Sequence, residues 1–169
     1  MHPYVELAKR AVEEFVRTGR APSAPPDLPP AMLIRAGVFV CLKARGQLRG
    51  CVGTFLPCAE TIYQEIVRNA VCAATKDTRF SPVQERELPE LSYTVDVLSA
   101  PVEVADLREL DPRKYGVIVA KGRRRGLLLP DLEGVDAVEE QLRIAMLKAG
   151  IDPSDSGVQI SKFTVERYH

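Results

Sequence analysis

The order of elements along the chain is the feature that most constrains its fold. Two apolar segments, Gly37 to Lys43 and Leu48 to Phe55, are separated by a short turn, which predicts a β-hairpin. Thr61 to Thr75 carries apolar residues at helical spacing. Leu91 to Val97 alternates apolar and polar side chains, as a half-buried antiparallel strand does. Together they predict an α+β fold with a mainly antiparallel sheet and flanking helices.

Much of this order recurs in the second half of the chain. Residues 116–119 and 125–128 echo 37–40 and 49–52, and the offset between matching segments shrinks from 79 to 70 residues. Asp136 to Ala149 is a predicted helix, with a capping box at Asp136 and Glu139 and a stop at Gly150. Residues 163–166 echo 93–96. We hypothesise an internal duplication of a hairpin-helix-strand unit, with repeats at about 37–99 and 116–167. The alternative is chance recurrence of common patterns.

The remaining segments complete a single domain. Residues 4–17 form a predicted amphipathic helix that stops at Gly19. Ala21 to Pro30 contains five prolines, so neither a helix nor a central strand fits there, and a stiff surface connector is expected. A chain of 169 residues can bury about 70% of its unfolded surface, enough to fold without a metal or disulfide.

Charge and hydropathy exclude several functions. Lys and Arg total 23 and Asp and Glu total 23, so the net charge is zero, which disfavours binding to nucleic acid or to anionic membranes. The basic segment Lys121 to Gly126 lacks interleaved aromatic residues that would stack bases. No apolar run is long enough to span a membrane, and charged residues fall where a signal peptide would be apolar. We expect a cytoplasmic protein.

The histidine and cysteine content limits the chemistry. His2 and His169 are the only histidines, so a catalytic triad or a histidine metal site in the core is excluded. The four cysteines, at positions 41, 51, 58 and 72, match no common metal spacing. We expect reduced thiols, no metal site and no cofactor.

The densest chemical signal is the segment LRGCVGT. Gly50 and Gly53 flank the central Cys51, and glycines in a strand are typical of a bulge or of close approach to the backbone. Arg49 supplies a planar cationic group suited to a carboxylate or phosphate, and its charge could lower the pKa of the Cys51 thiol. The segment is therefore either a ligand-contacting or reactive-thiol site, or a bulged strand in which Cys51 is a buried small hydrophobe.

A second signal follows the predicted helix that ends at Thr75. In the loop 76–82, Asp77 and Arg79 could form a local ion pair, and Phe80 could pack onto the core. This pattern is typical of an ordered loop, and equally of a loop that presents an arginine beside a cleft.

These motifs resemble the AMMECR domain family, and most closely its microbial branch, the AmmeMemoRadiSam system protein A group. LRGCVG at 48–53, DTRFSP at 77–82, LSYTVDVLS at 91–99, GLLLPDLEGVD at 126–136 and KAGI at 148–151 carry the resemblance, which covers about residues 4–168. It implies a single domain over residues 1–169 with two unequal lobes around a cleft. It also implies a shared pathway or complex with Memo-like and radical-SAM proteins. Val52 replaces the commoner isoleucine.

The resemblance implies a site but no established reaction. We expect the cleft to be lined by Leu48, Arg49, Gly50, Cys51, Val52, Gly53, Thr54, Asp77, Arg79, Phe80 and Pro82. The leading hypothesis is a protein that binds a small anionic ligand or a partner peptide, with arginines and exposed glycine N–H groups as donors. The alternatives are an enzyme or thiol carrier that uses Cys51 as its nucleophile, and a scaffold in a complex that uses the proline-rich segment or a sheet edge.

Overall fold

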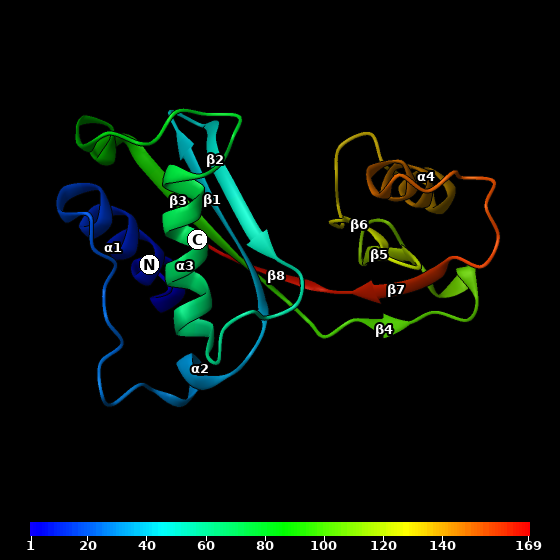
Figure 1. Cartoon of the computed structure of the whole chain (residues 1–169), viewed down its shortest axis with the longest axis horizontal. Coiled ribbons are helices and arrows are strands. Elements are labelled where there is room, and N and C mark those ends of the chain that lie inside the picture. Colours follow the sequence, from blue (N-terminus) through cyan, green and yellow to red (C-terminus); the bar gives the residue numbers. More distant parts are fainter. The chain divides into compact units, whose positions relative to one another are not determined.

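A computed structural model describes all 169 residues of the chain, which divide into two compact units with separate apolar cores (Figure 1). The first unit contains residues 1–98 and 166–169, and the second contains residues 99–165. Each combines helices with an antiparallel sheet, so the predicted α+β class is confirmed. No helix is long and apolar enough to cross a membrane.

The first sheet has the strand order β2-β1-β3-β8. The predicted hairpin is present as β1 (Gly37–Ala44) and β2 (Gln47–Thr54), with β3 (Leu91–Leu98) antiparallel to the other side of β1. The last strand, β8 (Val165–Tyr168), completes the sheet. β2 is therefore an edge strand.

Helices of the first unit pack on this sheet. α1 (Pro3–Thr18) contacts β3, and α3 (Ile62–Thr75) contacts β1 and β2. The short α2 (Pro30–Leu33) and the 3₁₀ helix η1 (Glu85–Glu90) complete the unit. As predicted, α1 ends at Gly19, whose φ of 73° lies in the left-handed region that favours glycine.

The second unit has a sheet of strand order β4-β7-β5-β6. The sheet consists of β4 (Val102–Glu103), β5 (Gly116–Lys121), β6 (Arg124–Leu128) and β7 (Gln159–Phe163). A 3₁₀ helix, η2 (Leu107–Glu109), lies between β4 and β5 in the chain, and α4 (Val138–Ala149) packs on β5 and β6. α4 ends at Gly150 as predicted. The predicted capping box is wrong, because the N-cap is Ala137 and the Asp136 carboxylate accepts a hydrogen bond from Arg113 instead.

The two units share an order of elements. Each has a hairpin, a helix and a strand, and the last strand pairs with the first strand of the hairpin, as β2-β1-β3 and β6-β5-β7. The proposed match of residues 163–166 to 93–96 is wrong, because β7 ends at Phe163 and β8 begins at Val165 in the other sheet. The counterpart of β3 is β7. The duplication itself stays a hypothesis.

Candidate functional site

The two sequence motifs meet at Cys51. Because β2 is an edge strand, one side of its backbone has no strand partner. The loop after α3 occupies that side. The Cys51 backbone N–H donates to Asp77 Oδ2 at 2.9 Å, and Arg79 Nη2 donates to the Cys51 carbonyl oxygen at 3.4 Å. The loop thus replaces a neighbouring strand at this one residue and closes the sheet edge there.

Asp77 and Arg79 form the local ion pair that the sequence predicts. The Arg79 Nε and Nη2 atoms donate to the two Asp77 carboxylate oxygens at 3.0 and 2.7 Å, and the Arg79 backbone N–H donates to Oδ1 at 3.1 Å. Hydrogen bonding from Arg79 holds the pKa of Asp77 well below its ordinary value, and the same bond raises the pKa of Arg79. The Asp77 side chain is 6% exposed and that of Arg79 is 55% exposed, so the pair presents its arginine to solvent.

Arg49 is held by a second carboxylate. Its Nε and Nη2 atoms donate to Glu87 of η1 at 2.8 and 3.2 Å. Hydrogen bonding from Arg49 lowers the pKa of Glu87. The Arg49 side chain is only 14% exposed. Its predicted action on the Cys51 thiol is therefore not what the structure shows, since the guanidinium is directed to Glu87.

Phe80 lies beside both arginines. The Arg49 and Arg79 Cζ atoms are 5.9 and 5.5 Å from the ring centroid, within the range of a cation–π interaction. Leu48, which is 41% exposed, and the exposed Pro82 belong to the same two segments. We call Leu48, Arg49, Cys51 and residues 77–82 the motif surface. Its two arginines and its two partner carboxylates cancel in charge.

The cysteines differ from expectation. Cys51 lies directly opposite Cys41 in the hairpin register, and the two form a disulfide. The expectation of four reduced thiols is therefore wrong for this pair, because the hairpin register brings two cysteines that are ten residues apart face to face. Cys58 is a free exposed cysteine, and Cys72 is free and partly buried. A nucleophilic Cys51 requires the reduced form and stays a prediction.

The two glycines of the motif serve packing. A Cβ atom on Gly50 would lie 2.1 Å from the Ala73 carbonyl oxygen, so α3 can cross β2 only over a glycine. A Cβ atom on Gly53 would lie 2.2 Å from the ring of Phe39. Gly50 is buried, so the expectation of an exposed glycine N–H donor is wrong at this position. Val52 packs against the core.

The Thr54 hydroxyl belongs to a buried polar network. It donates to Glu65 Oε1 and accepts a hydrogen bond from the Asn69 side chain at 3.2 Å. Glu65 is 1% exposed and also accepts the backbone N–H groups of Cys58 and Ala59 at 2.9 and 2.7 Å. Sequence reasoning missed the roles of Glu65 and Glu87. A glutamate on the apolar face of a predicted helix was the available signal for Glu65.

No group of three or more His, Cys, Asp and Glu side chains is arranged to hold a metal ion. The fold and the motif surface define a class of α+β proteins. In this class, a loop with the Asp-x-Arg pattern hydrogen-bonds to the edge strand of the hairpin that contains the LRGC sequence. The chain matches the AMMECR1 family over residues 5–168 and belongs to that family.

Relatives of the chain include uncharacterised proteins. It is 56% identical to a protein of Thermotoga maritima, over 99% of this chain and 97% of the other. It is 49% identical to protein CA_C1420 of Clostridium acetobutylicum over 98% of this chain, but spans only 36% of that protein's length. The crystal structure of uncharacterized protein PH0010 from Pyrococcus horikoshii superposes with a TM-score of 0.87 at 34% identity, covering 97% of this chain and 88% of that one.

Proposed function

We propose that the chain is a binding protein that recognises an extended peptide segment of a partner at the motif surface. The observation that carries this proposal is the Asp77–Arg79 clamp on the backbone of Cys51, which joins both motifs into one surface. Arginine and aromatic side chains are enriched at the centres of protein interfaces. Because the clamp fixes Arg79 before any partner arrives, little side-chain freedom is lost on binding. The cleft between lobes stays a prediction.

The local charges favour a peptide over a small anion. Arg49 and Arg79 each direct two donor nitrogens to a carboxylate of the chain itself. A small anion would have to compete with these internal carboxylates for a site without net positive charge. A peptide can instead use Phe80, Leu48 and the remaining arginine donors without breaking either ion pair.

Memo-like and radical-SAM proteins are the partners we propose to test first, following the family resemblance. Each would be produced from its gene in the genome that encodes this chain. The purified protein would then be titrated against this chain by calorimetry. We expect one of them to bind, with affinity falling at least about tenfold for Leu48→Glu, because a charge would be buried against an apolar contact. Leu48 is 41% exposed, so this variant should fold.

Arg79→Ala should weaken binding similarly, and Arg108→Ala is its matched control. Arg108 forms the same Asp-x-Arg pair, with Asp106 at 2.6 Å, but its side chain is 90% exposed and lies in the second unit. Unchanged affinity for Leu48→Glu and Arg79→Ala, or no binding by either protein, would reject the proposal.

A second candidate function is thiol–disulfide exchange, which the Cys41–Cys51 pair favours. In the reduced protein the Cys51 thiolate would attack a substrate disulfide and release one thiolate. The Cys41 thiolate would then attack Cys51 Sγ, releasing the second thiolate and forming the Cys41–Cys51 disulfide. Two electrons pass from the cysteine pair to the substrate. This is the enzyme or thiol-carrier alternative with Cys41 as resolving residue.

Redox titration with peptide mapping tests this candidate. The protein would be equilibrated in glutathione buffers, alkylated, and digested. We expect residues 41 and 51 to change state together and Cys41→Ser to trap a glutathione adduct on Cys51, with Cys72→Ser behaving as wild type. A pair that stays oxidised under all glutathione ratios would mark a structural disulfide and exclude the carrier.

A further inference from the structure

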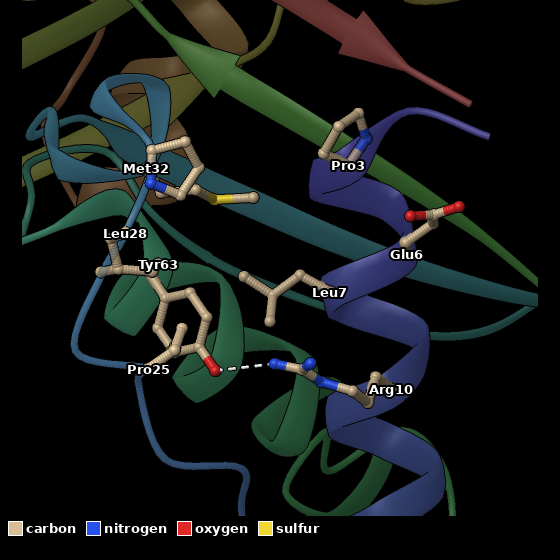
Figure 2. Close-up of a pocket in the computed structure, with 9 residues that line it drawn as sticks. Pro3, Glu6, Leu7, Arg10, Pro25, Leu28, Met32 and Tyr63 are labelled. Atoms are coloured by element: carbon tan, nitrogen blue, oxygen red, sulfur yellow. Dashed lines mark hydrogen bonds between the residues drawn. The ribbon is translucent and has the colours of Figure 1, made fainter.

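A cavity of about 330 Å³ lies in the first unit between α1, α3 and the proline-rich connector (Figure 2). None of its lining residues belongs to the motif surface. The volume is at the lower end of the range for small-molecule sites, about 300–1,000 Å³. It is therefore a separate candidate site, sized for a small molecule.

The walls of the cavity are mostly apolar. Leu7 comes from α1, and Leu28 and Met32 come from the connector and α2. Pro25 and Pro29 also line the cavity, so the connector, expected from sequence as a plain surface link, forms one wall. Its prolines restrict the backbone and make that wall stiff. Such walls suit a compact hydrocarbon group.

Arg10 is the one cationic residue among those that line the cavity, and it is also exposed to solvent. Arg10 Nη2 donates to the Tyr63 hydroxyl at 2.8 Å (Figure 2). That hydroxyl donates to the Ser23 carbonyl oxygen at 2.9 Å. No carboxylate lies within 4.0 Å of the Arg10 guanidinium, in contrast to Arg49 and Arg79. Arg10 is thus held in place by Tyr63, with its remaining N–H donors uncommitted.

The nearby acidic residue forms no direct ion pair with Arg10. Glu6 lies one helical turn before Arg10 and contributes to the lining. In Figure 2 its carboxylate points away from the cavity, whereas Leu7 and Arg10 point toward it. Of the two charged residues in the lining, Arg10 is therefore the one directed toward a ligand in the cavity.

We propose that this cavity binds a small monocarboxylate with a compact apolar body. The planar guanidinium of Arg10 would bind the carboxylate through paired N–H···O hydrogen bonds. The hydrocarbon part would contact Leu7, Leu28 and Met32. A neutral molecule of the same shape would lack the negative charge that pairs with Arg10, and an amine would bring a second positive charge.

Methyl NMR can test this proposal with a site-specific readout. The chain has three methionines, of which Met32 lines the cavity, Met146 is buried in the second unit, and Met1 is exposed. Protein labelled at the methionine methyl groups would be titrated with hexanoate and, separately, with hexanamide, its neutral counterpart. We expect hexanoate to shift Met32 alone and hexanamide to bind at least about tenfold more weakly.

Two variants complete the design. Arg10→Met keeps the apolar stem and removes the charge, and should reduce hexanoate affinity about tenfold or more. Lys9→Met removes a charge from the same helix at a residue that does not line this cavity, and should bind as wild type. The proposal is overturned if no ligand shifts Met32, if hexanamide binds as tightly as hexanoate, or if Lys9→Met weakens binding as much as Arg10→Met does. The ligand comparison on the wild-type protein decides the matter even where Arg10→Met folds poorly.

Discussion

At the scale of single residues, Asp77 does the most to build the motif surface. Its carboxylate is almost fully buried, yet it accepts hydrogen bonds from the Arg79 side chain and from the backbone of Cys51 and Arg79. A buried charge is stable only when it is paired and hydrogen-bonded in this way. Asp77 therefore fixes both the loop and the arginine that the loop presents.

Asp77→Asn should lower the free energy of unfolding by about 1–3 kcal/mol at pH 7, because charge-assisted hydrogen bonds are lost. The folded-state pKa of Asp77 is depressed, so its stabilisation is complete above the unfolded value near 4 and is lost as pH falls toward the folded value. The difference between wild type and Asp77→Asn should therefore shrink from pH 7 to pH 3. Urea unfolding at several pH values measures it.

Asp106→Asn is the control for this prediction. Asp106 pairs with Arg108 at the same spacing, but the pair is exposed and contacts no strand edge. Its substitution should change stability by less than about 1 kcal/mol. Equal effects at residues 77 and 106, or a difference that does not vary with pH, would contradict a structural role for the Asp77 charge.

At the scale of elements, the buried Glu65 joins the start of α3 to the segment that follows β2. Glu65→Gln should destabilise the protein by about 1–3 kcal/mol, since an amide cannot accept all three hydrogen bonds. Glu60→Gln is the matched control, because Glu60 is exposed and its carboxylate has no hydrogen-bond partner. Thermal unfolding compares the two. A Glu65→Gln protein as stable as Glu60→Gln would show that the network contributes little.

In each unit, one helix crosses the hairpin at a glycine: α3 crosses at Gly50, and α4 crosses at Gly126. A Cβ atom at Gly126 would lie 2.2 Å from the Ala145 carbonyl oxygen, as one at Gly50 would lie 2.1 Å from that of Ala73. Gly50→Ala and Gly126→Ala should each cost about 1–3 kcal/mol through overpacking.

Amide hydrogen exchange should locate these two effects. Because the two cores are separate, we expect the loss of protection to concentrate in the first unit for residue 50 and in the second for residue 126. Uniform loss across both units for either variant would contradict this expectation.

Periodicity and turn chemistry were sufficient to predict several helices, strands and helix ends of this fold. The hairpin at 37–55, α3 and the glycine stops at 19 and 150 follow from local patterns, and the structure confirms them. The break between β7 and β8 was missed, because a continuous alternating pattern does not reveal that Thr164 separates strands of two sheets. The Asp136 cap was missed because a tertiary partner, Arg113, takes the carboxylate.

At the scale of the whole molecule, sequence motifs supplied candidate site residues but did not predict their contacts. Asp77 and Arg79 are close in sequence, so their pairing could be predicted. Their contact with Cys51, and that of Arg49 with Glu87, span 26 to 38 residues and depend on where α3 and η1 place the chain. The Cys41–Cys51 bond likewise depends on strand register, which the turn sets.

The central claim is that the LRGC strand and the Asp-x-Arg loop act as one recognition surface. Hydrogen–deuterium exchange of the chain, alone and with each proposed partner, the Memo-like and the radical-SAM protein, tests this claim most directly. We predict that residues 48–53 and 77–82 gain protection together, and that Leu48→Glu abolishes both gains at the same partner concentration. Protection confined to other segments, or gained by one of these two without the other, would contradict the claim.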